Sequence, residues 1–211
     1  MADGTVTYPG LPVPVISDHL SRDASRTRYA PGTEFQIGRI DMVANTGTYV
    51  DAPFHRYPAG ADLAGLGLEL LADLDGVVVR CTGRAGPAID EHAFTEIAVG
   101  GRAVLVHTGW DRHWGSPAYG VGHPFLTRTA AEYLARSGAT LVGIDSLNID
   151  DASDGTRPAH TLLLGAGIPI VEHLTGLERL PDTGFRFFAV PPMVRGMGSF
   201  PVRAFAIAGA R

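Results

Sequence analysis

The chain has 211 residues, 45% of them hydrophobic, which suits one domain with a sizeable core. Its net charge of −5, with no basic cluster, excludes a protein that binds nucleic acid through charge. All 17 basic residues are arginine, so a Schiff-base lysine and a lysine general base are excluded as well.

The sequence gives no sign of a membrane or secreted protein. It lacks a run of about 18 apolar residues, the length that a membrane-spanning helix needs. Its first residues lack the basic start and apolar core of a secretory signal, so we expect a cytoplasmic protein. The single cysteine, Cys81, cannot form an intrachain disulfide, which fits a reducing compartment. Its apolar surroundings favour a small buried side chain over a nucleophile.

Several short segments rich in Val, Ile, Phe or Ala, most of them bounded by Gly, Pro or Asp, predict strands. Segments 103–108 and 139–145 are nearly continuous apolar runs, so we expect central strands covered on both faces. Segments 35–42 and 185–190 partly alternate, which predicts strands with one wet face. The full set of expected strands is 35–44, 76–81, 103–108, 139–145, 185–190 and 201–208.

Helical patterns lie between these strands. Segment 126–138 offers Thr127 as an N-cap and Gly138 as a C-terminal stop, with an apolar stripe of Ala130, Ala131, Leu134 and Ala135. Segments 89–97 and 160–167 predict shorter helices. We therefore expect an α/β (α+β) protein, a single compact domain over residues 1–211 built around one sheet system. Residues 1–34 are expected to form an irregular N-terminal arm.

Two histidines stand out among the eight because carboxylates accompany them. Asp51 and His55 share the tight loop NTGTYVDAPFH, and His160 precedes Glu172 by a short helix and an apolar run. A helix followed by a returning strand can bring His160 and Glu172 to the same end of the sheet. Two carboxylates and two imidazoles suit a divalent ion such as zinc or manganese. His173, next to Glu172, is expected to point to the opposite face if that segment is extended.

The same loop resembles a known signature. The cyclase family of metal-dependent hydrolases, which includes kynurenine formamidases and isatin hydrolases, carries His-x-Gly-Thr-His-x-Asp-x-Pro-x-His, and residues 45–55 follow this pattern with Asn45 and Tyr49 in place of two histidines. Segments 107–110, 143–150, 158–174 and 199–208 resemble later family segments in the same order. The resemblance therefore spans nearly the whole chain from about residue 35.

This resemblance implies a swivelling β/β/α fold, assembled as a homodimer or homotetramer. By position, Asp51, His160 and Glu172 match the ligands of the family's second metal ion, and His55 matches its catalytic base. The other ion's two histidines are Asn45 and Tyr49 here. Because Tyr ligates a metal well only as phenolate, and its ordinary pKa is near 10, a two-ion site is not expected.

Three hypotheses remain open. In the first, Asp51, His160 and Glu172 hold one zinc or manganese ion, and His55 acts as the base or as a fourth ligand. Tyr49 stabilises the oxyanion during hydrolysis of an amide, lactam or lactone.

In the second, no metal binds, and His55, Asp51 and Tyr49 perform acid–base chemistry on a carbonyl compound, as a cyclase, isomerase or dehydratase. In the third, the chain is a non-catalytic binding protein on an inherited fold. For either enzymatic hypothesis we expect a small-molecule substrate and no nucleic-acid or membrane partner. We expect Asn45, Phe54 and Trp110 to contact that substrate.

Overall fold

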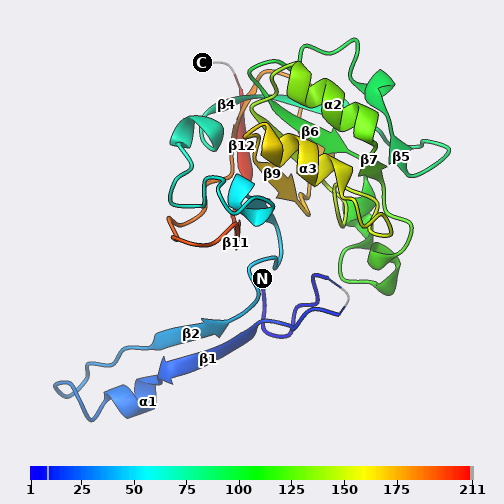
Figure 1. The fold of residues 1–211 in the computed structure, drawn as a ribbon. Coiled ribbons are helices and arrows are strands. Elements are labelled where there is room, and N and C mark those ends of the chain that lie inside the picture. The colour runs from blue at the N-terminus through cyan, green and yellow to red at the C-terminus, as the bar shows by residue number, and fades with distance from the viewer. Residues whose placement is uncertain (9, 210–211) are drawn as a thin grey trace.

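The computed structural model describes residues 1–8 and 10–209. Its centre is an eight-stranded sheet with the strand order β11-β3-β9-β8-β6-β4-β10-β12 (Figure 1). In chain order the strands of this sheet are β3 (Tyr49–Asp51), β4 (Leu74–Arg80), β6 (Ala103–His107), β8 (Leu141–Ile144), β9 (Ile170–Glu172), β10 (Phe185–Phe188), β11 (Ser199–Pro201) and β12 (Phe205–Ala208).

The middle of the sheet is parallel and buried. β4, β6, β8 and β9 pair in parallel, and every residue of β6 and β8 is buried, which confirms the two predicted central strands. Alternate residues enter two separate cores, as the pleat of a strand requires. Val104 and Val106 pack into the core beneath the helices, whereas Leu105 packs into the core on the other face.

Two helices cover one face of the sheet, α2 (Arg128–Arg136) and α3 (Pro158–Gly165), and they pack against each other (Figure 1). Thr127 caps α2 by accepting a hydrogen bond from the Ala130 amide at 3.3 Å, which confirms the predicted start. The predicted helix over 89–97 is wrong. This segment contains the end of β5 (Ala88–Ile89), which pairs with β7 (Phe125–Leu126), followed by a single 3₁₀ turn, η3 (Glu91–Ala93).

The remaining helical elements are short. They are α1 (Arg22–Ser25) and the 3₁₀ turns η1 (Pro53–His55), η2 (Leu68–Leu70), η4 (Trp110–His113), η5 (Pro117–Gly120) and η6 (Leu177–Arg179). Among the helices of residues 1–8 and 10–209, none is long and apolar enough to cross a membrane.

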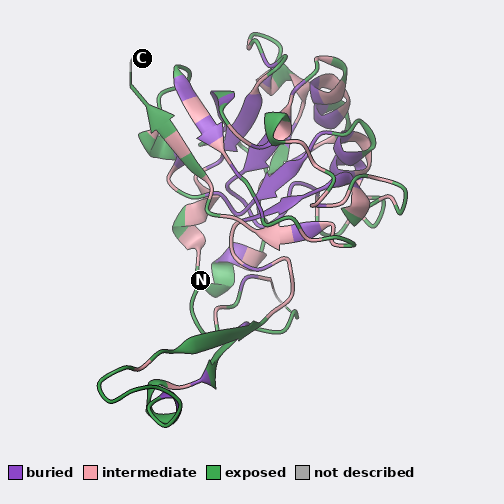
Figure 2. Ribbon diagram, turned by 90° about the vertical axis from the view of Figure 1, so that its left-hand side faces the viewer, coloured by how far each residue is buried: buried purple, intermediate pink, exposed green. Residues whose placement is uncertain are grey.

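A two-stranded ribbon projects from the body of the molecule (Figure 1). Its strands β1 (Val15–Leu20) and β2 (Ile37–Asp41) pair antiparallel, so the expectation of an irregular arm over 1–34 is wrong for this part. All five residues of β2 are exposed rather than one face only, because the ribbon has no packing partner among the described residues (Figure 2). By contrast, β10 alternates between buried and half-buried residues, as its pattern predicts.

The order of β11, β3 and β9 brings distant parts of the chain together. β3 lies between β11 and β9, with Asp51 opposite Ser199 and Tyr49 opposite Glu172. The helix α3 leads back to β9. The signature loop, α3 and two strands therefore meet at one end of the sheet.

Candidate functional site

Asp51 lies at the centre of this meeting point. It ends β3 and is completely buried. Its Oδ1 atom accepts a hydrogen bond from the Ser199 hydroxyl, whereas its Oδ2 atom has no hydrogen-bond partner among the described residues. A buried carboxylate oxygen without a hydrogen bond lowers the stability of the fold, which indicates that this position binds a ligand.

His55 is held on its Nδ1 side by the same serine. The Ser199 oxygen lies 2.9 Å from His55 Nδ1, and Asp51 Oδ1 lies 3.7 Å from it. A hydroxyl has one proton, and an ionised Asp51 can only accept. Ser199 therefore donates to Asp51 and accepts from His55 Nδ1–H, which leaves the lone pair of a neutral imidazole on His55 Nε2.

His160 is oriented by Asp150, a residue that the sequence analysis did not select. His160 Nδ1 lies 2.6 Å from Asp150 Oδ2, so its Nε2 atom faces the other carboxylates, 3.7 Å from Asp51 Oδ2 and 3.8 Å from Glu172 Oε1. Burial alone would lower the pKa of His160. The hydrogen bond to Asp150 and the nearby carboxylates of Asp51 and Glu172 outweigh burial and raise this pKa to about 10.

Glu172 and Tyr49 form a buried pair. The Tyr49 hydroxyl donates to Glu172 Oε2, and the Ile149 amide donates to Oε1 at 2.6 Å. Burial, and then the charges of Glu172 and Asp51, hold the pKa of Tyr49 well above its ordinary value, although a hydrogen bond with Asn45 opposes the shift. Tyr49 is therefore a neutral donor and not a phenolate ligand. Burial is also the main cause that raises the pKa of Glu172 to about 7.

These side chains fit a divalent ion. Asp51, His55 and His160 each offer a ligand atom, and these three atoms lie within 4.8 Å of one another. Two metal–ligand bonds of about 2.0–2.2 Å can bridge the separations around His160 Nε2. The hydrogen bond from His160 to Asp150 is the carboxylate–histidine arrangement that accompanies metal-ligating imidazoles. Asp51 Oδ2, which has no hydrogen-bond partner among the described residues, offers a free lone pair to such an ion.

A small cavity opens onto the two histidines. It has a volume of about 190 Å³ and is lined by His55, Arg56, Asn148, Arg157 and His160. Because no acidic residue lines it, the cavity presents basic and amide groups to solvent, while the carboxylates lie buried behind the histidines.

The three residues expected to contact the substrate, Asn45, Phe54 and Trp110, are not among the residues that line this cavity. Phe54 is half-buried in η1, beside His55. Asn45 is half-buried and hydrogen-bonds Tyr49. The Trp110 indole donates to the Tyr119 carbonyl at 2.9 Å, so this side chain braces η4 against η5. Trp114, four residues further on, is the tryptophan that lines a larger cavity.

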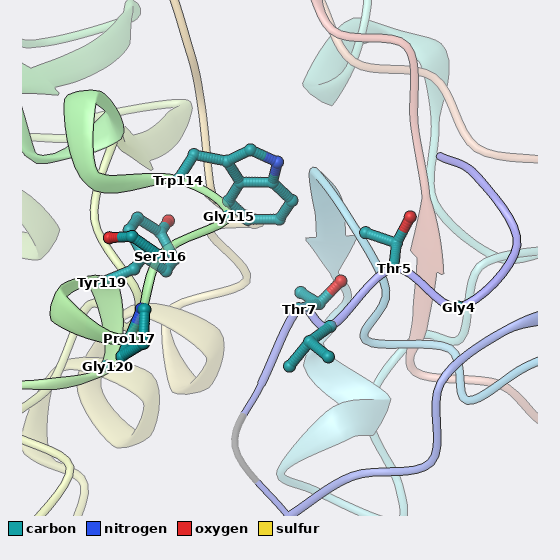
Figure 3. Close-up of a pocket in the computed structure, with 10 residues that line it drawn as sticks. Gly4, Thr5, Thr7, Trp114, Gly115, Ser116, Pro117, Tyr119 and Gly120 are labelled. Atoms are coloured by element: carbon teal, nitrogen blue, oxygen red, sulfur yellow. The ribbon is translucent and has the colours of Figure 1, made fainter.

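That larger cavity, of about 520 Å³, lies between the N-terminal segment and the loop of η4 and η5 (Figure 3). Trp114 points from this loop toward Thr5 (Figure 3). The neighbouring His173 has a left-handed backbone, φ +56°, so its segment is not extended there. Its ring lies against Tyr49 rather than on the opposite side, with 5.3 Å between ring centroids, and burial lowers its pKa to about 3.

Comparison with known proteins places the chain in a family. Residues 3–151 match the family model Cyclase, described as "Putative cyclase", so the chain belongs to the cyclase family. The kynurenine formamidase of Geobacillus thermodenitrificans is 32% identical over 183 residues, which cover 85% of this chain and 84% of that protein. The kynurenine formamidase of Bacillus cytotoxicus is 28% identical over 209 residues, covering 94% and 89%.

Solved structures share the fold. Isatin hydrolase A from Labrenzia aggregata, bound to benzyl benzoate, superposes with a TM-score of 0.77 at 22% identity, over 98% of this chain and 93% of that one. A potential metal-dependent hydrolase with cyclase activity superposes with a TM-score of 0.71 at 26% identity, over 91% and 96%. The expected α/β fold of the cyclase family is thereby confirmed.

Proposed function

We propose that this chain is a hydrolase that cleaves an amide, lactam or lactone of a small carbonyl compound, at a site that holds one zinc or manganese ion. The observation that carries the proposal is the buried Asp51 Oδ2, which has no hydrogen-bond partner among the described residues and faces His160 Nε2 at 3.7 Å. The similarity of the chain to kynurenine formamidases, and to a structure described as a potential metal-dependent hydrolase, supports hydrolysis as the class of reaction.

Asp51, His160 and Glu172 are the proposed ligands. When bound, a divalent ion would supply Lewis-acid chemistry, which polarises the substrate carbonyl and lowers the pKa of water. Asp150 fixes the His160 ring so that Nε2 faces the ion's position, through the contact of 2.6 Å. The carboxylates of Asp51 and Asp150 and the Glu172 side chain provide the negative charge that balances the cation.

His55 is the proposed general base, because its Nε2 carries the free lone pair and its ring lines the cavity. Nε2 takes a proton from the attacking water while the water oxygen bonds to the carbonyl carbon. The bond from that carbon to nitrogen, or to the lactone oxygen, then breaks, and the leaving atom takes the proton from Nε2. The products are a carboxylic acid and an amine or alcohol, and Ser199 keeps the imidazole aligned throughout.

Tyr49 takes no part in these proposed steps. Its hydroxyl donates to Glu172 and its side chain is 2% exposed, so it has no free proton to offer in the cavity. The metal-free hypothesis relied on Tyr49 as a proton donor into the site. We therefore assign Tyr49 to the support of Glu172, with Asn45 behind it.

We also propose that the protein works as a homodimer in the cytoplasm. The ribbon exposes Val15, Ile16, Ile37 and Ile40, each between 44% and 55% exposed. A two-stranded ribbon is marginally stable in water, so a second copy of the chain is a fitting cover for these side chains. The free, buried Cys81 suits a reducing compartment.

The test is a hydrolysis screen of tag-free protein loaded with zinc or with manganese. N-formylkynurenine, an aryl lactam and an aryl lactone are the substrates, with release of acid as the readout. We expect turnover of at least one of them, and a loss of roughly 10²–10⁴-fold in kcat in His55→Ala, because a general base contributes that much. His92→Ala, at an exposed position in η3, is the control. Absence of turnover of all three by both loaded forms would contradict the proposal.

A further inference from the structure

Two arginines without acidic partners line the cavity beside His55 and His160. Some other arginines of the chain pair with carboxylates, as Arg80 does with Asp182 at 2.9 Å. Among the described residues neither Arg56 nor Arg157 forms an ion pair. We infer that Arg157, assisted by Arg56, binds a carboxylate group of the substrate. This inference rests on the proposed hydrolysis and narrows its substrate class to amides, lactams or lactones that carry a carboxylate.

Arg157 is held in place by neutral groups alone. Its guanidinium donates to Asn148 Oδ1 at 3.4 Å and to the carbonyls of Asp151 and Ala152 at 3.2 and 3.3 Å. These contacts are long, and all three acceptors are uncharged. The Tyr8 side chain also hydrogen-bonds Arg157 and Asn148. Hydrogen bonds, and to a lesser extent the charge of Arg157, lower the pKa of the nearby Asp151. No carboxylate of the described residues, however, forms an ion pair with the guanidinium, whose planar shape suits a planar carboxylate.

The backbone places Arg157 on the same element as a proposed ligand. It lies immediately before α3 with φ +47°, a left-handed conformation that an arginine rarely adopts, and His160 follows three residues later. Strained backbone that directs a side chain into a cavity is typical of binding sites. A substrate carboxylate on Arg157 would therefore lie beside the histidines that act on the carbonyl.

Arg56 supplies a second positive charge to the lining of the cavity. Its Nε atom donates to Thr161 Oγ1 at 3.3 Å, and its guanidinium lies 5.4 Å from the centre of the Tyr57 ring. It directly follows His55 at the end of η1. Each arginine thus lies at the end of an element that carries one of the histidines, Arg56 at η1 with His55 and Arg157 at α3 with His160.

The volume of the cavity limits how much of a substrate it can enclose. Its volume of about 190 Å³ is below the 300–1,000 Å³ of pockets that enclose a whole drug-sized ligand. It therefore suits the reacting carbonyl and a neighbouring carboxylate, while the rest of the substrate stays outside. A phosphate would bring a second negative charge toward the buried Asp51 and Glu172, which disfavours it.

The experiment compares two probes of nearly the same shape with the metal-loaded enzyme, 2-formamidobenzoate, which carries a carboxylate, and 2-formamidobenzamide, which carries a neutral amide in its place. We expect the formamide of 2-formamidobenzoate to be hydrolysed with at least a tenfold higher kcat/KM than that of 2-formamidobenzamide, chiefly through a lower KM. Arg157→Gln should remove most of this preference. Arg136→Gln, which removes an exposed charge at the far end of the neighbouring helix α2, should keep it.

A second measurement does not depend on catalysis or on the fold of a variant. Binding of the fluorescent products 2-aminobenzoate and 2-aminobenzamide to the wild-type protein is titrated directly, with inorganic phosphate and benzoate as competitors. Selective binding of the acid supports the inference even if neither formamide is hydrolysed, in which case only the proposed reaction fails. Equal binding of the acid and the amide, or equal kcat/KM for the two formamides, overturns the inference and leaves the proposed hydrolysis intact. Stronger competition by phosphate than by benzoate also overturns it.

Discussion

Replacement of Ser199 by alanine tests the hydrogen-bonded chain from Asp51 to His55. The change removes the hydroxyl that donates to Asp51 Oδ1 and that lies 2.9 Å from His55 Nδ1. Asp51 is completely buried, and its other oxygen already lacks a partner. A hydrogen bond to a charged group contributes about 1.5–3 kcal/mol. At roughly 2–4 °C per kcal/mol for a chain of this size, Tm should fall by about 3–12 °C.

The same change should slow the reaction, because His55 loses the partner that fixes its ring and its tautomer. Loss of such an orienting partner typically costs about 10–100-fold in activity. Thermal unfolding followed by circular dichroism, and kcat on whichever substrate the screen identifies, are the assays. Ser153→Ala is the control, because Ser153 also donates to an aspartate, Asp151 Oδ1 at 2.7 Å, but at an exposed site. If Ser199→Ala shifted Tm and kcat no more than Ser153→Ala, the hydrogen-bonded chain would have no functional weight.

Three further outcomes follow from the structure. Asp150→Asn should weaken metal affinity about 10–100-fold, measured by competition with a chelator, because the charged acceptor that orients His160 is lost. Cys81 should resist a thiol reagent in the native protein and react fully in urea, because burial raises its pKa to about 11; rapid labelling of the native protein would contradict this. Ile16→Asp with Ile40→Asp, an opposed pair on the ribbon, should yield monomers in sedimentation velocity, whereas Ile207→Asp on the body should not; monomeric wild-type protein would refute the proposed dimer.

Local sequence patterns predicted the elements whose stability is local. The apolar runs of β6 and β8 specify burial on both faces, and the Thr127 cap specifies where α2 begins. Segment 89–97 failed because its first residues pair with β7, through the Thr127 amide and the Ile89 carbonyl at 2.9 Å. That long-range pairing overrides a modest helical propensity. The predicted strand over 35–44 contains β2, but β1 was missed, because it lies in the expected irregular arm and is formed by pairs such as Val15 with Asp41.

The candidate site divides in the same way. The signature pattern and the helix-to-strand spacing predicted that Asp51, His160 and Glu172 can converge. In the structure, His160 Nε2 lies 3.7 Å from Asp51 Oδ2 and 3.8 Å from Glu172 Oε1. Ser199 could not be found by spacing, because it lies 148 residues from Asp51 in sequence. Asp150 had a weak signal, as a carboxylate ten residues before His160, but only the fold shows that it binds the ring nitrogen.

Metal content is the most direct test of the proposed one-ion site. Protein purified without chelator or His-tag is loaded with zinc or manganese, desalted and analysed by inductively coupled plasma mass spectrometry. We expect about one ion per chain in the wild type and in His92→Ala, loss of that ion in His160→Ala, and retention in His55→Ala, because His55 is the proposed base and not a ligand. A wild-type protein that holds no ion after loading with either metal would contradict the metal site, and with it the proposed hydrolysis.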